Sequence, residues 1–453
     1  MNIAVIGAGA YGSYTIDVLQ NKYPDAKITL FEVGNKHIKT EEEIGFKSNI
    51  LNAPYAGLSK GRYFGFGGST AKWGGQILLF SKNDFKQPSP FLKEIVDLNE
   101  KYREQVFSKF TIQNAFTENY ISENLFTKTG VWLGYFNRNL FKYFKIAKRK
   151  NVTIISLARV IKMEIADDKS VNRIIYIQNG VQKEAGFDYY FLTAGAFESH
   201  RILLNSGLVK DKQISFSDHL SQKIFKIKGS TKIGSDDFAF KVNGTSLITK
   251  RIIGEIDGVS FFANPIFNSE FPFFQNLKKI LFKQEINFKI IKSVIADIQS
   301  CFAFGWSLLI KNQIYVYKNE WYLYIDIENP IGKNTISLCE QLDKYNDHSL
   351  NVDFKIDNNV LRLYENAKEQ IKELLIKHQV QFEECNSQID VEKSEDTYHP
   401  FGMLCNFSSC SEYFNQYKNM LVVNTGILPR AGGINPTAAV FPLIEEYVSR
   451  NLN

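Results

Sequence analysis

The sequence predicts an α/β protein with two parts: a discontinuous domain of Rossmann-like strand–helix units, and a second, α+β domain built on a mostly antiparallel sheet. The prediction rests on three observations. The chain opens with an apolar strand, a glycine-rich turn and a helix; a similar unit recurs near residue 190; and strand-like runs follow residue 226. With 453 residues, 44% of them hydrophobic, the chain is large enough for two packed cores.

Composition and charge narrow the class of protein. The 54 Lys and Arg residues against 48 Asp and Glu leave a net charge of +6 without a basic tail, so a nucleic-acid partner is not expected. The five cysteines show no zinc or disulfide spacing, which favours a reduced compartment. The first ten residues lack the features of an export signal, and no run of about 18 apolar residues occurs. We therefore expect a cytoplasmic protein.

The first element is typical of a dinucleotide-binding turn. An apolar strand at residues 3–6 runs into Gly7, Gly9 and Gly12, and a helical pattern follows. Gly7 permits the turn, Gly9 lets a pyrophosphate approach the backbone, and Gly12 lets the helix lie close to the strand. A second strand ends at Glu32, whose carboxylate can accept hydrogen bonds from a ribose diol. FAD and NAD use the same device, so this element alone leaves the cofactor open.

Two further segments suit a backbone that passes close to a flat or anionic ligand. Residues 61–75, with the sequence GRYFGFGGSTAKWGG, contain six glycines. An apolar strand at residues 189–192 runs into TAGAFES, after which a helical pattern resumes and ends at Gly207. Taken alone, the first segment could equally be a flexible surface loop.

Together with two C-terminal motifs, these segments resemble the glucose-methanol-choline (GMC) family of FAD-dependent oxidoreductases. The matched blocks are GAGAYG with Glu32, GFGGSTAKWGG, TAGAFESHRILLNSG followed by SDHL, and residues 398–450, in the family's order and over roughly a fifth of the chain. The resemblance implies FAD as cofactor. Besides the first three glycines and Glu32, the residues that it places at the cofactor are Arg62, Gly67, Gly68, Ser69, Trp73, Gly74, Val160, Ala194, Gly195, Pro436 and Thr437.

The WGG ending of the glycine-rich loop is closest to the pyranose-oxidase-type branch of this family. In that branch a histidine just before the tryptophan can bond covalently to the flavin, and Lys72 stands in its place here. The resemblance therefore implies non-covalent FAD. It also implies that the backbone of Val160, on the strand-like stretch 151–160, contacts the adenine; an ordinary sheet strand is the alternative for this stretch.

The C-terminal motifs imply the catalytic pair. His399 lies in the family's His-x-x-Gly block, and Asn435 lies in its Asn-Pro block shortly before the last helix. Alcohol oxidation needs a base for the hydroxyl proton and a donor that holds the developing alkoxide while hydride leaves for flavin N5. By the resemblance, His399 is the base and Asn435 its partner, while the backbone amide of Thr437 faces the flavin pyrimidine edge. For His219, in the SDHL segment, contact with substrate or cofactor is the alternative to a structural role.

The matched blocks are separated along the chain, so the cofactor domain is expected to be discontinuous. The expected FAD-binding domain comprises residues 1–85, 150–225 and 395–453. The expected substrate-binding domain and lid insertions comprise residues 86–149 and 226–394. In the second insertion, residues 313–317 and 321–327 are strand-like and residues 363–378 have helical periodicity.

Segment 261–295 is unusual because phenylalanines alternate with lysines. We favour an aromatic core or lid whose lysines face water, because Pro265 and Pro272 interrupt the first half and Glu285 lies in the second. The alternative is a weak contact with an anionic membrane surface that would admit an apolar or lipid-linked substrate.

The sequence thus predicts an FAD-dependent enzyme that oxidises a primary or secondary alcohol to a carbonyl, with a sugar or glycoside as the expected substrate. Oxygen or another electron acceptor would then reoxidise the flavin. Two alternatives stay open. One is a lyase or other non-redox enzyme with structural FAD, and the other is a membrane-surface flavoprotein that acts on a lipid-linked substrate.

Overall fold

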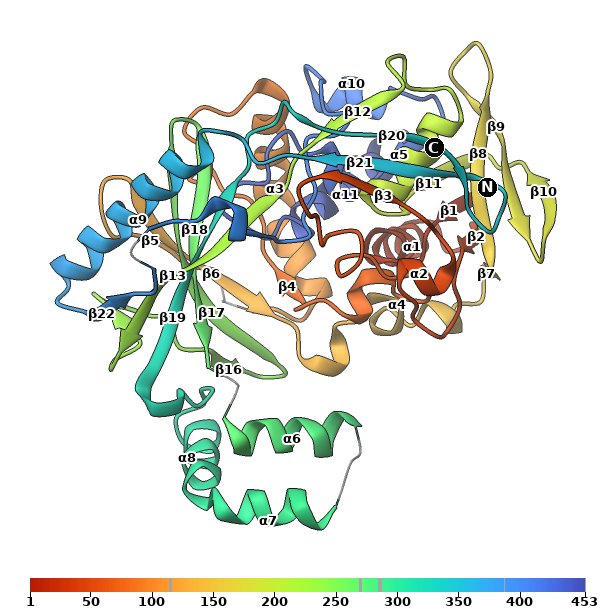
Figure 1. The fold of residues 1–453 in the computed structure, drawn as a ribbon. Helices are drawn as coiled ribbons and strands as arrows, with labels where there is room; N and C mark the ends of the chain where they lie inside the picture. The colour runs from red at the N-terminus through yellow and green to blue at the C-terminus, as the bar shows by residue number, and fades with distance from the viewer. Residues whose placement is uncertain (114–115, 269–270, 284–286, 387, 453) are drawn as a thin grey trace.

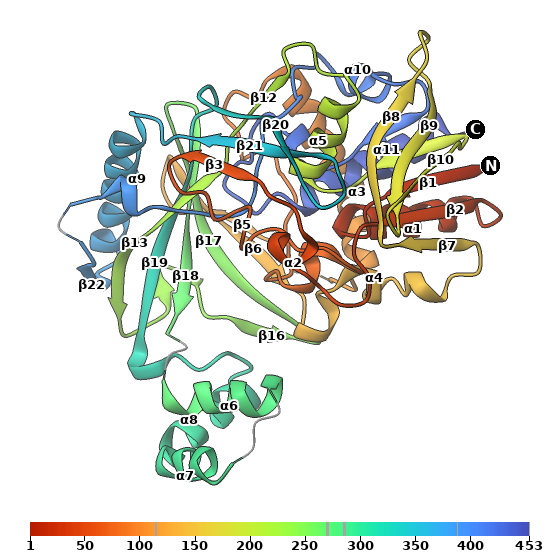
Figure 2. The same ribbon diagram turned by 45° about the vertical axis from the view of Figure 1, so that its right-hand side comes forward.

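The structure is a computed structural model that describes residues 1–113, 116–268, 271–283, 287–386 and 388–452. These residues form a mixed α/β fold with five sheets (Figures 1 and 2). A parallel sheet lies on one side of the molecule and a larger antiparallel sheet on the other. The mixed α/β class predicted from the sequence is therefore confirmed.

The parallel sheet assembles strands from distant parts of the chain. Every neighbouring pair in it is parallel. Its order is β24 (Met420–Val422), β11 (Tyr189–Leu192), β1 (Asn2–Ile6), β2 (Lys27–Glu32) and β7 (Val152–Ser156). Parallel strands are covered on both faces, which explains why β1 is apolar at four consecutive positions rather than at alternate ones.

The two faces of the parallel sheet pack against different layers. Ile3 and Val5 of β1 belong to a core with helices α1 (Ala10–Lys22), α3 (Pro90–Lys109) and α11 (Phe441–Asn451). Ala4 and Ile6 belong to a second core with α5 (Ala196–Asn205) and a three-stranded sheet. That small sheet consists of β8 (Ala158–Ile165), β9 (Val171–Gln178) and β10 (Val181–Ala185).

The antiparallel sheet forms the opposite side of the molecule (Figure 1). Its main order is β22 (Gln381–Glu384), β13 (His219–Lys228), β19 (Glu320–Glu328), β18 (Val259–Phe267), β17 (Ser246–Ile256), β6 (Leu125–Trp132) and β4 (Gln76–Ile77). Three short strands pair beside this path, namely β5 (Glu118–Tyr120), β16 (Lys241–Asn243) and β23 (Glu395–Asp396). The buried apolar face of the sheet packs against α9 (Val360–Lys377), an amphipathic helix, which matches the period read from the sequence.

A four-stranded sheet and several short elements complete the fold. The sheet has the order β12 (Gln213–Phe216), β20 (Asn334–Leu342), β21 (His348–Phe354) and β3 (Asn49–Asn52). The short elements are α2 (Glu41–Ile44), α4 (Leu140–Tyr143), α10 (Cys410–Phe414), β14 (Lys232–Ile233) and β15 (Asp236–Asp237).

Three segments have a different structure from the one predicted from the sequence. The stretch 151–160 is two strands, because Leu157 has a φ of 54° and breaks β7 from β8. Residues 313–317 form no strand beyond a single bridge from Gln313 to Lys241, since a 3₁₀ turn begins at Tyr317. The insertion 86–149 contributes α3 to the core of the parallel sheet and β6 to the antiparallel sheet.

Three helices project from the end of the antiparallel sheet: α6 (Pro272–Lys283), α7 (Phe288–Ala296) and α8 (Ile298–Leu309) (Figures 1 and 2). The lysine- and phenylalanine-rich segment 261–295 therefore comprises β18, α6 and α7, and its residues 269–270 and 284–286, with Glu285, lie outside the described residues. Within the part of the chain that the structure describes, no helix has both the length and the apolar character needed to cross a bilayer.

Candidate cofactor and active site

An elongated cavity runs along the carboxyl ends of β1, β2 and β11, where ligands bind in parallel α/β sheets. It brings together residues from each of the sequence blocks. The predicted site residues that line it are Gly7, Gly9, Glu32, Arg62, Gly68, Ser69, Trp73, Val160, Ala194, Gly195, His399 and Thr437. The predicted site residues outside this lining are Gly12, Gly67, Gly74, Asn435 and Pro436.

The three glycines after β1 have three different roles. Gly7 has a φ of 104°, which favours glycine, and a Cβ on it would lie 2.7 Å from the backbone of Ala194. A Cβ on Gly12 would lie 1.9 Å from the carbonyl oxygen of Gly7, so only glycine lets α1 approach the turn. A Cβ on Gly9 would meet nothing within 4 Å, because this position faces the cavity. No side chain caps α1 at Gly9, so its first amides are available for an anion.

Glu32 is buried and held in one orientation by backbone donors. Its Oε2 accepts from the amide of Ala8 at 2.9 Å, and its Oε1 accepts from the amides of Gly34 at 2.8 Å and Gly65 at 3.0 Å. Burial raises the pKa of Glu32, and the three amides oppose this shift. A carboxylate offers about four acceptor positions, so one is left for a ligand hydroxyl.

The glycine-rich loop packs over the first turn. A Cβ on Gly68, which has a φ of 51°, would lie 3.2 Å from the Cα of Gly9, so the two glycine segments are in close approach. Gly67 and Gly74 serve packing instead, because a Cβ on them would meet the side chains of Asn139 at 2.3 Å and Trp132 at 2.7 Å.

Two side chains of the same loop are fixed by hydrogen bonds. The Ser69 hydroxyl donates to the carbonyl of Gly61 at 2.9 Å, and the Trp73 indole donates to the carbonyl of Arg138 at 2.8 Å. Lys72, between them in sequence, is exposed and does not line the cavity.

Part of the cavity lining is charged, and its side chains are joined by ion pairs and hydrogen bonds. Arg62 lies 3.6 Å from Glu198, which also accepts from Arg201 at 3.0 Å. Burial alone would raise the pKa of Glu198, but the guanidinium groups of Arg201, Arg159 and Arg62 lower it to about 2. The carbonyl of Val160, which lines the cavity, accepts from Arg201 at 2.8 Å.

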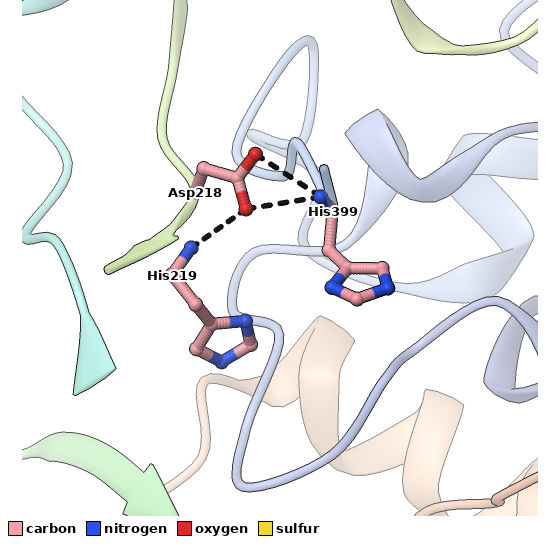
Figure 3. A group of neighbouring side chains, drawn as sticks. All are labelled: Asp218, His219 and His399. Carbon is pink, nitrogen blue, oxygen red and sulfur yellow. Dashed lines mark hydrogen bonds between the residues drawn. The ribbon is translucent and has the colours of Figure 1, made fainter. Parts of the chain in front are cut away.

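His399 reaches the cavity from a strained segment. The preceding residue, Tyr398, has a φ of 66°, a conformation that costs a non-glycine residue about 1–3 kcal/mol and persists only where the surroundings impose it. The carboxylate of Asp218 imposes it here, because both of its oxygens accept from the His399 amide at 3.0 Å. Figure 3 shows this carboxylate facing the backbone nitrogens of His399 and His219, while the two rings extend beyond it.

The His399 ring is oriented by a threonine between it and Asp218. The Thr397 hydroxyl lies 3.2 Å from Asp218 Oδ1 and 3.0 Å from His399 Nδ1. When Asp218 is a carboxylate, it accepts from this hydroxyl, whose oxygen then accepts from Nδ1–H of His399. In that state Nε2 of His399 carries no proton; burial and the neighbouring Asp396 raise the pKa of Asp218 to about 8, so this state is favoured at higher pH. Burial, together with the positive charges that His219 and Arg251 can carry, lowers the pKa of His399 to about 3, so the ring is neutral near pH 7.

His219 is a structural neighbour of this centre. Its buried ring lies edge-on to the His399 ring, with centroids 6.4 Å apart. Its Nε2 is 2.7 Å from the carbonyl of Gly432, in the loop that leads to Asn435. Burial lowers the pKa of His219, so the neutral ring donates from Nε2 and leaves Nδ1 unpartnered.

Asn435 lies beside a buried arginine that the sequence motifs did not indicate. Its Oδ1 is 3.3 Å from Nη1 of Arg251, on β17. His399 and Asn435 share this neighbour, because the charge of Arg251 also depresses the pKa of His399. Thr437 lines the cavity at the start of a 3₁₀ turn, Ala438–Val440, which leads into α11. Pro436 is buried behind it.

The cluster of Asp218, His219 and His399 also has to be considered as a metal site. Within the described ranges it is the only place where three such ligand atoms lie within 4.8 Å of one another. Both oxygens of Asp218 already accept from backbone amides, and Nε2 of His219 is bonded to a carbonyl. These contacts fit a hydrogen-bonded support for His399 better than a metal centre.

The donor set along the cavity fits FAD. Gly9 leaves open space at an uncapped helix N-terminus, which suits a pyrophosphate, and Glu32 retains an acceptor position for a ribose. The same cavity is also lined by the neutral imidazole of His399 and by Thr437 at the start of a 3₁₀ turn. The residues that sequence reasoning missed are Asp218, Thr397 and Arg251; only the SDHL segment gave a signal, for the first of them.

Comparison with known proteins gives the fold. No protein-family model matches the chain, and no curated protein matches it in sequence. Its structure is similar to the crystal structure of pyridoxine 4-oxidase from Mesorbium loti, with a TM-score of 0.54 and 15% sequence identity. The match covers 99% of this chain and 98% of that chain, so the two proteins share a fold over almost their whole length.

Proposed function

We propose that this protein is an FAD-dependent oxidoreductase that oxidises an alcohol to a carbonyl, with His399 as the base. One observation carries the proposal: a histidine that is neutral near pH 7 lines the same cavity as the glycine turn and Glu32. The fold likeness to pyridoxine 4-oxidase supports oxidation of a small molecule at this coarse level. It supports the GMC fold broadly; the pyranose-oxidase-type branch rests only on the WGG sequence.

The residues around His399 would manage the proton of the reaction. Bound FAD would supply the hydride acceptor. Nε2 of His399 would accept the hydroxyl proton, and the resulting charge on the ring would be shared with Thr397 and Asp218 through Nδ1. Asn435 would donate its amide N–H groups to the reacting oxygen, because its carbonyl oxygen is taken by Arg251.

We further propose that FAD is held without a covalent bond and that the substrate is a sugar or glycoside alcohol. The first point rests on Lys72 in place of the linking histidine. Oxygen or another acceptor would close the cycle. A lyase with structural FAD is the competing reaction class, because the same fold and base serve a proton transfer without redox change.

The test is anaerobic reduction of the bound flavin. We expect the purified protein to be yellow and a true alcohol substrate to bleach it, and His399→Gln to slow bleaching by about 10²–10⁴-fold. His378→Gln is the matched control, since His378 ends α9 and does not line the cavity. A colourless protein that cannot be reconstituted would refute the proposal, and turnover without bleaching would favour the lyase.

A second candidate, a flavoprotein acting at a membrane surface, is favoured by the projecting helices. The helix pair α7–α8 carries large apolar side chains that are mostly exposed: Phe288 is 81% exposed, Phe302 72% and Leu309 76%. Such a cluster on a monomer marks an interaction surface. Among the described residues 271–311, the only acidic side chain is Asp297, whereas Lys279, Lys289, Lys292 and Lys311 are exposed. This combination suits anionic lipid and a lipid-linked substrate.

A further inference from the structure

Arg251 is a buried cation without an anionic partner. It is 2% exposed, on β17, beside Asn435. The other buried cations in the described part of the chain each have a carboxylate within 4 Å; they are Lys128, Arg159, Arg201 and Lys368. Among the described residues no carboxylate lies within that distance of Arg251, so it departs from the rule that the rest of the molecule follows.

The neighbours of Arg251 do not neutralise it. Its guanidinium donates to the side-chain carbonyls of Gln76 and Asn435 and lies 4.5 Å from the centre of the Phe262 ring. Burial lowers the pKa of Arg251 to about 10, which still leaves it charged near pH 7. A buried charge without a counterion is unfavourable, so the site is incomplete as it stands.

Two buried aspartates affect Arg251 only at longer range. Asp84 is already paired with Lys128. Asp326 accepts from Asn264 at 3.1 Å, and burial raises its pKa to about 6. Neither aspartate forms an ion pair with the guanidinium, so the anion has to come from elsewhere.

Two buried donors without hydrogen-bond partners lie on the face of the sheet that carries Arg251. Gln76 is 3% exposed, and its Nε2 has no hydrogen-bond partner although its Oε1 accepts from Arg251. Trp132 lies directly opposite Gln76 in the β4–β6 pair, and its buried Nε1 also has no partner. Directly opposite residues of paired strands point to the same face of a sheet, so both donors lie on the side that carries the guanidinium.

We propose that Arg251, Gln76 and Trp132 bind the carboxylate of the substrate, which would be an alcohol that also carries an acid group, such as a sugar acid. A guanidinium matches a carboxylate with two parallel hydrogen bonds, and the amide and indole N–H groups suit its remaining acceptor positions. Because Arg251 contacts Asn435, the carboxylate would be fixed next to the centre where the hydroxyl reacts. This inference rests on the proposed function, and it narrows the substrate class.

The experiment compares matched charged and neutral alcohols. Holoprotein is titrated anaerobically with D-glucuronate against D-glucose, 4-(hydroxymethyl)benzoate against benzyl alcohol, and glycolate against ethylene glycol, with thermal shift and flavin absorbance as readouts. We expect at least one acid to bind at least tenfold more tightly than its neutral partner. Arg251→Gln should abolish this preference and Arg251→Lys should retain part of it. Lys250→Gln should leave it unchanged, because Lys250 neighbours Arg251 in the chain and pairs with Asp236.

Each outcome decides the inference. The absence of any acid preference in all three pairs, or a preference that survives in Arg251→Gln, would overturn it. An Arg251→Gln variant whose flavin potential shifts while the acid preference persists would assign the cation to the cofactor instead. Circular dichroism and flavin content show whether a variant is folded, and Arg251→Lys keeps the test valid if Arg251→Gln is not. If the purified protein holds no flavin but thermal shift still shows that it binds the acids, the proposed function is refuted and the carboxylate site is retained.

Discussion

At the scale of single residues, the chemistry depends on how His399 is held. Its amide, its Nδ1 and the backbone strain at Tyr398 are all governed by Asp218, directly or through Thr397. Burial and the neighbouring Asp396 raise the pKa of Asp218, and the hydrogen bonds from Tyr55 and from the amides of His399 and His219 oppose this. The motif around residue 399 predicted the base, whereas its support by Asp218, just before β13, and by Thr397 could not be inferred from spacing.

The lowered pKa of His399 predicts how the rate of flavin reduction depends on pH. At pH 5.5, the protonated form of a histidine with an ordinary pKa of about 6.5 would exceed the neutral form about tenfold, so most of the molecules would have no base. His399, with a pKa of about 3, stays neutral as the pH falls through this range and is lost as a base only near pH 3. We therefore expect no fall in the rate of anaerobic flavin reduction with a midpoint near pH 6.5; a fall with a midpoint near pH 8 would report protonation of Asp218, whose pKa burial and Asp396 raise to about 8. A tenfold fall with a midpoint near pH 6.5 in stopped-flow measurements would contradict this.

At the scale of elements, the first turn shows how few residues fix a local structure. Gly7 and Gly12 are required by backbone contacts within the turn and with the neighbouring strand β11, so the glycine pattern alone was enough to predict strand, turn and helix. The strand β7 is a different case. Its end at Leu157 depends on a single positive φ, which no periodic pattern of apolar residues reveals.

The glycines of this turn separate folding from cofactor binding. Gly9→Ala adds a methyl group to open space in the cavity, so we expect a stably folded protein with FAD affinity reduced at least tenfold. Gly12→Ala places its Cβ against the carbonyl of Gly7 and should cost about 1–3 kcal/mol in the free energy of unfolding. Denaturant unfolding of the apoprotein and fluorescence titration with FAD measure the two effects. Equal loss of stability in both variants would show that Gly9 has a packing role instead.

At the scale of the whole molecule, two sheets of different kinds meet at the candidate site. The glycine turn and Glu32 come from the parallel sheet, whereas Asp218 and His219 lie at the start of β13 and Arg251 lies on β17 of the antiparallel sheet. The contact between the sheets therefore determines where cofactor and substrate would meet. The projecting helices α6–α8 lie outside the cores of the two sheets, and α7 and α8 expose the large apolar side chains of Phe288, Phe302 and Leu309 (Figure 2).

The exposed apolar side chains of α7 and α8 predict that the protein binds an anionic membrane surface. We expect the protein to float with vesicles that contain phosphatidylglycerol more than with neutral phosphatidylcholine vesicles, because lysines border the apolar face. The double variant Phe302→Ser, Trp306→Ser should reduce flotation at least tenfold. Phe136→Ser is the matched control, since Phe136 is 89% exposed and lies outside these helices. Self-association through this face without vesicle binding, seen by analytical ultracentrifugation, would contradict the membrane assignment.

Features that depend on neighbouring residues could be read from the sequence: the opening strand, turn and helix, the apolar strand at residues 189–192, and the mixed α/β class. These follow from backbone requirements and burial patterns over a few positions. Tertiary structure alone decided that Asp218 and Thr397 hold His399, that Arg251 lies unpaired beside Asn435, and that α3 joins the parallel sheet. The physical reason is that such contacts join segments up to several hundred residues apart, and they exist only once the two sheets have packed together.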